Sequence, residues 1–168
     1  MPFFIVSEDI TEMDVDAVVN AANTDLRMGS GVCGAIFRAA GREAMEEACS
    51  RFRPVKTGEA VITPGFELPA RFVIHTPGPV YHEQKAAWCE ERLRASYRNA
   101  LELAVVHHFE SVAFPLISSG AYGYPKEEAL QVAISEIRKF LETRELAVYL
   151  TLFTEVEIMP LREQRDME

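Results

Sequence analysis

The amino-acid sequence predicts one α/β domain of three layers, in which a largely parallel or mixed sheet is covered by helices on both faces. Apolar runs with strand character alternate along the chain with stretches of helical spacing, a pattern typical of such sheets. A length of 168 residues suits a single domain with a sizeable core. No repeat, low-complexity tract or linker divides the chain, so we expect residues 1–168 to form one domain with a loose, charged tail after Pro160.

The first half of the chain contains both kinds of element. Short apolar runs predict strands at Phe3–Val6 and Val15–Asn20, the second of which is rich in valine and too short for a helix. Helical spacing follows at about Val32–Ala40, is interrupted by one glycine, and resumes at Arg42–Phe52. The run Glu59–Thr63 lies between a Thr-Gly turn and a Pro-Gly pair, so we expect it to be a strand.

The second half repeats this alternation. Arg71–Thr76 is a strand-like run that a Pro-Gly-Pro sequence stops, and Ala86–His107 has apolar residues at the spacing of a long amphipathic helix. The next predicted strand is Ser111–Leu116. A helix is predicted to start at Pro125, because the missing N–H of proline costs little in the first turn. Leu146–Phe153 is the last predicted strand.

Composition and charge exclude several classes of protein. The three cysteines, Cys33, Cys49 and Cys89, show no metal-ligand spacing, so we expect reduced thiols rather than a zinc site or disulfides. A net charge of −9 argues against a nucleic-acid partner, because nucleic-acid binding needs a basic face. No apolar run is long enough to cross a bilayer, and the first residues lack a signal-peptide pattern. We therefore expect a soluble, cytoplasmic protein without a membrane partner.

Two glycine-containing loops follow predicted strands. Asn20–Gly34 contains asparagines and then glycines that open a helix, and Pro115–Gly123 contains two glycines and a tyrosine. In open α/β sheets, ligands gather beyond the carboxyl ends of strands, and glycine lets backbone N–H groups converge on phosphate oxygens. Each loop alone is better explained as a simple turn, but the pair favours a phosphate-containing ligand.

The first loop does not fit the common nucleotide-binding motifs. Gly29–Gly34 spells GxGxxG, yet the eight residues Ala21–Met28 separate it from the predicted strand, whereas the Rossmann fingerprint follows its strand directly. No lysine follows these glycines as a P-loop requires. The residues alone thus indicate a phosphate ligand without naming it.

A series of short motifs runs in order through the chain from about Phe3 to Phe153. The motifs are Asp9-Ile10-Thr11, Val19-Asn20-Ala21-Ala22-Asn23, Gly29-Ser30-Gly31-Val32-Cys33-Gly34-Ala35-Ile36, Arg38-Ala39-Ala40-Gly41, Thr57-Gly58-Glu59-Ala60, Ile74-His75-Thr76, Gly78-Pro79 and Ser118-Ser119-Gly120-Ala121-Tyr122-Gly123-Tyr124-Pro125. In these motifs the sequence resembles the macrodomain family of ADP-ribose-binding modules, most closely its single-domain hydrolase branch. The resemblance implies a three-layer α/β/α sandwich with a mixed, largely parallel central sheet.

The resemblance also implies roles for single residues. Asp9 would accept a hydrogen bond from the adenine amino group, with the Ile10 backbone beside it, and Phe153 would stack on the adenine. Asn23 would bond the hydroxyls of the distal ribose, and Tyr122 would pack across that sugar. The remaining expected ligand-binding residues, mostly in the two loops, are Ala22, Gly29, Ser30, Gly31, Val32, Ser118, Ser119, Gly120, Ala121 and Gly123.

The chain departs from the hydrolase branch at Cys33. Members of that branch commonly carry aspartate at this position, where it orients or activates water near the anomeric carbon. A neutral thiol is a poor replacement for a carboxylate base. The family also includes hydrolases without that aspartate, which use a water held by the ligand's own phosphate. The candidate catalytic residues are therefore Asn23, Cys33 and Tyr122.

Structural roles compete with these assignments for several residues. Without the resemblance, Asp9 would be an exposed turn residue and Phe153 a core residue of a strand. Cys33 is better explained as a small packed residue than as a nucleophile. His75 ends an apolar strand and is interpreted as a structural histidine rather than a base.

These observations support two main hypotheses of function. The first is an enzyme that binds ADP-ribose, attached to an acidic side chain or as its O-acetyl ester, and hydrolyses the ester bond at the distal ribose by positioning. The second is a non-catalytic reader that binds ADP-ribose or an ADP-ribosylated protein, which Cys33 favours. A third, an RNA-interacting regulator, is disfavoured by the charge of −9. Nothing in the sequence requires a metal or a cofactor.

Overall fold

The computed structural model describes residues 2–152 of the chain. The strands are β1 (Phe3–Val6), β2 (Ala17–Ala22), β3 (Val61–Pro64), β4 (Phe72–Pro77), β5 (Ser111–Phe114) and β6 (Ala147–Thr151). The helices are α1 (Gly31–Ala40), α2 (Arg42–Ser50), α3 (Ala86–Val106) and α4 (Lys126–Leu141), with the short 3-10 helices η1 (Ile10–Glu12) and η2 (Glu83–Lys85).

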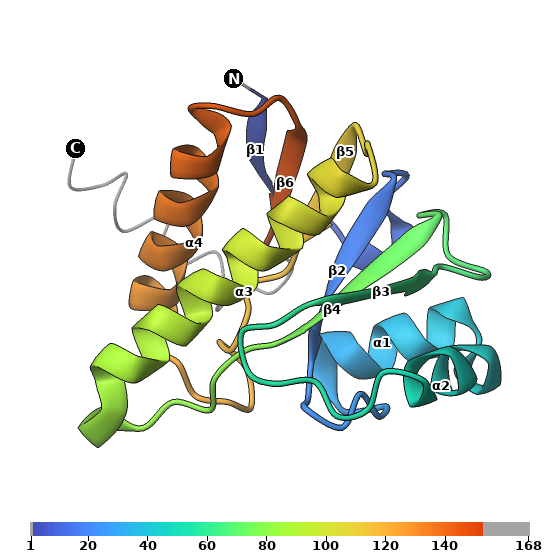
Figure 1. The fold of residues 1–168 in the computed structure, drawn as a ribbon, viewed down its shortest axis with the longest axis horizontal. Coiled ribbons are helices and arrows are strands. Elements are labelled where there is room, and N and C mark those ends of the chain that lie inside the picture. The colour runs from blue at the N-terminus through green and yellow to red at the C-terminus, as the bar shows by residue number, and fades with distance from the viewer. Residues whose placement is uncertain (1, 153–168) are drawn as a thin grey trace.

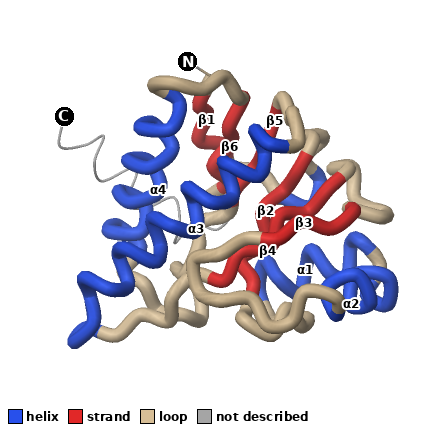
Figure 2. Tube along the Cα trace, viewed as in Figure 1, coloured by secondary structure: helices blue, strands red, loops and turns tan. Residues whose placement is uncertain are grey.

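The six strands form one sheet in the order β1-β6-β5-β2-β4-β3, with helices on both faces (Figures 1 and 2). The antiparallel pair is β3 and β4, and the other neighbouring strands run parallel. The predicted α/β sandwich with a mixed, largely parallel sheet is therefore confirmed. Because most strands are parallel, their carboxyl ends meet at one edge of the sheet.

Two hydrophobic cores lie on opposite faces of the sheet. Successive strand residues alternate between them, as the pleat of a strand requires: Val18 packs toward α1 and α2, and Val19 packs toward α3 and α4. Both residues are fully buried, so the strands read as continuous apolar runs rather than as alternating ones. The helices therefore hold the sheet from both sides and fix the edge at which the loops lie.

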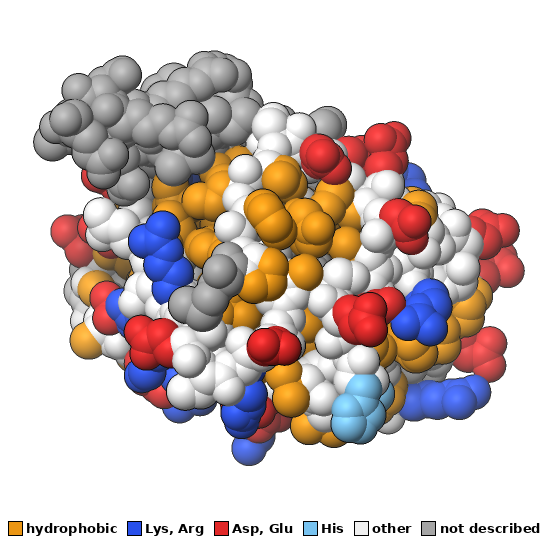
Figure 3. All heavy atoms as spheres, turned by 90° about the horizontal axis from the view of Figure 1, so that it is seen from above, with side chains coloured by type: hydrophobic (Ala, Val, Ile, Leu, Met, Phe, Trp, Pro, Cys, Tyr) orange, Lys and Arg blue, Asp and Glu red, His pale blue; other side chains and the backbone are white. Residues whose placement is uncertain are grey.

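The surface carries charges of both signs. On the face seen from above in Figure 3, acidic and basic side chains of the described residues are interspersed with apolar ones. No helix within residues 2–152 is long and apolar enough to cross a bilayer.

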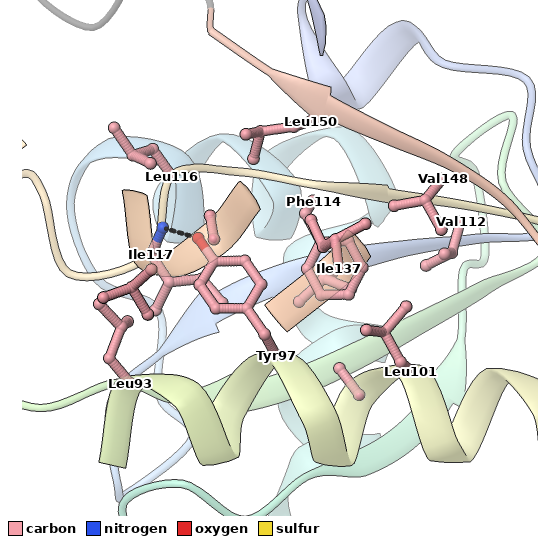
Figure 4. Close-up of a cluster of buried hydrophobic side chains, with 14 of the residues drawn as sticks. Leu93, Tyr97, Leu101, Val112, Phe114, Leu116, Ile117, Ile137, Val148 and Leu150 are labelled. Carbon is pink, nitrogen blue, oxygen red and sulfur yellow. Dashed lines mark hydrogen bonds between the residues drawn. The ribbon is translucent and has the colours of Figure 1, made fainter. Parts of the chain in front are cut away.

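Tyr97 of α3 connects a core to the segment that follows β5. Its ring packs 5.3 Å from that of Phe114, centroid to centroid, in the core between the sheet and α3 (Figure 4). The phenol oxygen donates to Pro115 O at 3.3 Å and accepts from Ile117 N at 3.0 Å. A residue in the middle of a helix thus sets the path of the chain into the second glycine-containing loop.

The predicted strand ends differ from the structure by a few residues. β2 continues to Ala22, two residues beyond the predicted end at Asn20, because it pairs with β4 as far as the partners Ala22 and Pro77. β5 ends at Phe114 rather than at Leu116, because the backbone after it bonds to Tyr97 instead of to a neighbouring strand.

Similar corrections apply to other elements. β3 spans Val61–Pro64 rather than Glu59–Thr63, and α2 ends at Ser50 rather than at Phe52. Pro125 is not the first helical residue as predicted; with φ −54° and ψ 126° it is the N-cap of α4.

Candidate ligand-binding cleft

A cleft of about 570 Å³ lies beyond the carboxyl ends of β2, β5 and β6. Its volume suits a nucleotide-sized ligand. Two loops form its walls, one leading from β2 into α1 and the other from β5 toward α4. Both of the glycine-containing loops that the sequence singled out therefore face a single cavity.

Most of the predicted site residues line this cleft. They are Asp9, Ile10, Ala22, Asn23, Gly29, Ser30, Gly31, Val32, Cys33, Ser118, Ser119, Gly120, Ala121 and Tyr122. Gly123 was predicted to bind ligand, but it is exposed and lies outside the lining, where its N–H closes a turn on Gly120 O at 3.0 Å. Phe153 lies outside the described residues. What the lining residues do toward a ligand stays a prediction.

Several lining residues were not predicted. They are Ala21, Ala35, Gly78, Pro115, Leu116, Ile117, Lys126 and Thr151. Gly78 packs against the second loop so closely that a Cβ there would lie 2.3 Å from Ser118 Oγ. The Gly78-Pro79 motif was visible in the sequence, but this contact with a distant loop was not.

The first wall of the cleft is the N-terminus of α1. The helix begins at Gly31, whose φ of +58° is a conformation that favours glycine. Its N-cap, Ser30, makes no side-chain capping bond, so the N–H groups of the first turn remain available to a ligand. Gly34 packs on this loop so closely that a Cβ would lie 2.5 Å from Gly29 O. An uncapped helix N-terminus of this kind favours an anion.

The second wall is the loop from Leu116 to Tyr124, in which five carbonyl groups accept hydrogen bonds from the protein. The pairs are Ser119 N and Oγ with Leu116 O, Tyr124 N with Ser118 O, Gly123 N with Gly120 O, Tyr81 N with Tyr122 O, and Lys126 Nζ with Ser119 O. Within residues 2–152, the N–H groups of Ser118, Gly120, Ala121 and Tyr122 donate to no protein acceptor. The loop therefore offers donors to the cleft, an arrangement suited to phosphate oxygens.

Ser118 is the most constrained residue of this loop. Its φ of +66° is uncommon for a residue with a side chain. Its hydroxyl is buried and finds no partner among the described residues. A strained backbone and an unpaired hydroxyl in a cleft wall both indicate that Ser118 contacts a bound ligand.

The Asn23 side chain is held by the backbone of its own loop. Its Oδ1 accepts from Arg27 N at 3.1 Å, and its Nδ2 donates to Arg27 O at 2.9 Å. One N–H and one lone pair remain for a ligand. The predicted bonds to ribose hydroxyls are compatible with this geometry.

Asp9 caps η1 at the edge of the cleft. Its Oδ1 accepts from Thr11 N at 3.0 Å and from Thr11 Oγ1 at 2.7 Å. These two bonds fix the carboxylate, whose other oxygen forms no hydrogen bond with the described residues. A carboxylate accepts hydrogen bonds only, so this oxygen suits an amino group such as that of adenine.

Cys33 lies in the first turn of α1, where the thiol is enclosed by neutral groups. Its Sγ is 3.6 Å from Asn20 Nδ2, which donates, and 3.6 Å from Arg27 O, which accepts. Burial raises the pKa of the Cys33 thiol. The thiol is therefore neutral near pH 7 and serves as a wall of the cleft rather than as a base.

His75 continues this polar contact into the core. Asn20 Nδ2 is 3.0 Å from His75 Nδ1, and since an amide nitrogen only donates, the ring proton is assigned to Nε2. His75 Nε2 then donates to Thr63 Oγ1 at 2.9 Å. Complete burial lowers the pKa of His75 to about 3. The interpretation of His75 as a structural histidine is confirmed.

The buried His75 is expected to make folding stability depend on pH. The unfolded chain binds a proton at this ring below about pH 6.5, whereas the folded protein binds it only near pH 3. Stability is therefore full above pH 6.5 and falls as the pH falls toward 3. Between pH 7 and 4.5 the wild type should lose roughly 2–3 kcal/mol more than a His75→Gln variant.

Urea unfolding of both proteins at pH 7 and pH 4.5 measures this difference. Carboxyl groups titrate in both proteins. The contribution of His75 is therefore the difference between the two proteins in how far the free energy of unfolding falls from pH 7 to pH 4.5. Parallel pH profiles for the wild type and the variant would show that His75 is not responsible.

Within the described part of the chain, no group of three His, Cys, Asp or Glu side chains is arranged to hold a metal ion. The cysteines are all unpaired and buried. Among the described residues, the cleft is lined by backbone N–H groups, amide and hydroxyl side chains, the Cys33 thiol, the Asp9 carboxylate and the Lys126 ammonium group.

Comparison with known proteins places this cleft in context. A family model described as "Macro domain" matches residues 19–133. The chain is 48% identical over 143 residues to the O-acetyl-ADP-ribose deacetylase of Salmonella typhimurium, covering 82% of this chain and 78% of that protein. It is also 48% identical over 134 residues to mouse ADP-ribose glycohydrolase MACROD1, covering 80% of this chain but 41% of that protein.

Solved structures show the same architecture. The Oceanobacillus iheyensis macrodomain with ADP superposes with a TM-score of 0.89 at 42% identity, over 97% of this chain and 89% of that one. The Trypanosoma brucei macrodomain in complex with ADP-ribose gives a TM-score of 0.88 at 37% identity, over 98% of this chain and 69% of that one.

Proposed function

This chain belongs to the macrodomain family, and from that premise we propose that it binds ADP-ribose and hydrolyses an ester bond at the distal ribose. The substrates would be ADP-ribose esterified to an acidic protein side chain, or O-acetyl-ADP-ribose. The observation that carries the proposal is the cleft itself, in which two walls of unpaired backbone N–H groups face one cavity. Relatives named for these activities support the choice of substrate.

The cleft supports one orientation of the ligand. The Asp9 carboxylate suits the adenine amino group, and the start of α1 and the second loop supply donors for the diphosphate. Asn23 and Tyr122 would then lie at the distal ribose. The phenol of Tyr122 is half-buried, and burial raises its pKa, so it stays neutral and packs on the sugar.

Catalysis would rest on positioning rather than on a strong base. The Cys33 thiol is neutral; its sulfur accepts a hydrogen bond from the Asn20 amide and donates one to the carbonyl oxygen of Arg27. In our proposal a phosphate group of the ligand holds the attacking water, Asn23 fixes the sugar, and the carboxylate leaves as the water adds. The water's proton goes to the departing carboxylate, so the products are the free acid and ADP-ribose.

The alternative is a reader that binds the same ligand and leaves it intact. The observation favouring it is again Cys33, whose surroundings provide no base at the position where the hydrolase branch carries aspartate.

We also propose a cytoplasmic location and no nucleic-acid partner. Three buried, unpaired cysteines suit a reducing compartment. The net charge of −9 disfavours a phosphate backbone as a partner, and on the face shown in Figure 3 acidic side chains stand among the basic ones.

The test follows two quantities with the purified protein. Titration calorimetry measures ADP-ribose binding, and a chromatographic assay measures ADP-ribose release from a glutamate-linked mono-ADP-ribosylated protein and acetate release from O-acetyl-ADP-ribose. Binding with turnover supports the hydrolase, and binding without turnover supports the reader. Absence of binding contradicts both.

A further inference from the structure

Lys126 is the first residue of α4 and reaches the wall of the cleft. Its side chain is half-buried, and its Nζ donates a hydrogen bond to the carbonyl oxygen of Ser119. Among the described residues that line the cleft, Lys126 is the one cation, and Asp9 is the one other charged residue. In a protein with a net charge of −9, this ammonium group is well placed to attract an anion.

The bond to Ser119 has a geometric consequence for the next residue. In a trans peptide the C=O and the following N–H point in opposite directions. Because Lys126 holds the Ser119 carbonyl, the N–H of Gly120 points away from Lys126. Gly120 lines the cleft, and its N–H donates to no acceptor within residues 2–152. The bond thus fixes the orientation of one donor offered to the ligand.

The other hydrogen bonds of this loop join neutral groups, such as Tyr124 N with Ser118 O at 2.9 Å and Ser119 Oγ with Leu116 O at 2.8 Å. A hydrogen bond from an ammonium group is about twice as strong as such a bond. Ser119 lies where the loop changes direction, between the strained Ser118 and the exposed Gly120. The conformation of the loop at Ser119 and Gly120 therefore depends more on the bond from Lys126 than on any single bond between neutral groups.

We propose that Lys126 is a positioning residue for the ligand's diphosphate, acting through the Ser119–Gly120 peptide and through its own charge. The inference rests on the proposed function, since it assigns Lys126 to the same cleft. It predicts that Lys126 sets ligand affinity, while the chemical step depends on the groups at the distal ribose.

The test compares Lys126→Met with Lys139→Met. Lys139 is exposed near the other end of the same helix, so its replacement removes the same charge far from the cleft. Lys126→Met should weaken ADP-ribose binding about tenfold or more and raise KM to match, with kcat changed less than about threefold. Lys139→Met should bind like the wild type.

Three further measurements separate positioning from a loss of folding. Lys126→Arg keeps the charge and a donor, so it should recover most of the affinity. In NMR spectra of the ligand-free protein, the amide signals of residues 118–123 should shift in Lys126→Met and stay in place in Lys139→Met. Raising the salt concentration should lower the ADP-ribose affinity of Lys126→Met less than that of the wild type, because the variant lacks the charge that salt screens.

The outcomes distinguish this inference from the proposed function. A wild-type protein that does not bind ADP-ribose overturns the proposed function itself. A wild type that binds, beside a Lys126→Met variant that binds equally well, overturns only the role of Lys126. Equal losses in Lys126→Met and Lys139→Met would reduce the effect to net charge and also overturn it.

Discussion

Replacement of Asn23 by alanine is expected to lower kcat/KM for ADP-ribose release by about 100-fold, because misplacing a substrate by about 1 Å costs that much. Two functions of the side chain are lost together. One is the pair of bonds with the Arg27 backbone at 2.9 and 3.1 Å, which shapes the loop before α1. The other is the free N–H and lone pair that would fix the distal ribose.

Comparing the change in kcat/KM with the change in ADP-ribose affinity shows whether Asn23→Ala affects binding or the chemical step. ADP-ribose affinity should fall by about tenfold, since the adenine and diphosphate contacts remain, so about half of the effect, a further loss of about tenfold, lies in kcat. Thr24→Ala is the control, because Thr24 is the exposed next residue in the same loop. A variant of Asn23 that keeps turnover within about threefold of the wild type would remove Asn23 from the mechanism.

The sequence was sufficient to predict where the cleft lies, because its walls are local in the chain. Gly31 at the start of α1 follows the end of β2 by nine residues, and Ser118 in the second loop follows the end of β5 by four. Apolar runs place those strands, and the rule that ligands gather at their carboxyl ends places the loops. The resemblance to a known family then supplied roles that periodicity cannot give.

Contacts between distant segments were not predictable in this way. Asn20 meets His75 because β2 and β4 pair in a register that makes those two residues partners. The rotation of α1 then brings Cys33 to the same amide. Register and rotation are set by tertiary packing, so the sequence left open whether Cys33 faces ligand or core. In the structure it does both, since it lines the cleft and bonds to buried Asn20.

Lys126 was missed for a related reason. In the sequence it is a charged residue at the start of a helix, a place where a solvated side chain is ordinary. Its bond to Ser119 depends on how the loop folds back over α4. A search for cations within a few residues of a glycine-containing loop would have selected Lys126 as a candidate. It would not have shown that Lys126 bonds to Ser119.

Gly31→Val is expected to weaken ADP-ribose binding by more than about 100-fold, because the new side chain would occupy the place of a desolvated ligand group. Gly31 has a φ of +58°, and no atom lies within 4 Å of the position its Cβ would take. Gly31 lines the cleft, so we expect the valine side chain to enter the space where a diphosphate would meet the first turn of α1.

The backbone strain that valine brings must be separated from this obstruction. A β-branched residue in the left-handed region is strained by about 1–2 kcal/mol, which lowers stability wherever it occurs. Gly41 is the matched control: its φ is +109°, it joins α1 to α2, and it lies outside the cleft lining. Gly41→Val should therefore lower the free energy of unfolding in urea while leaving ADP-ribose affinity within about twofold of the wild type. If Gly31→Val binds ADP-ribose as Gly41→Val does, the ligand does not approach the N-terminus of α1, and the diphosphate must be held elsewhere.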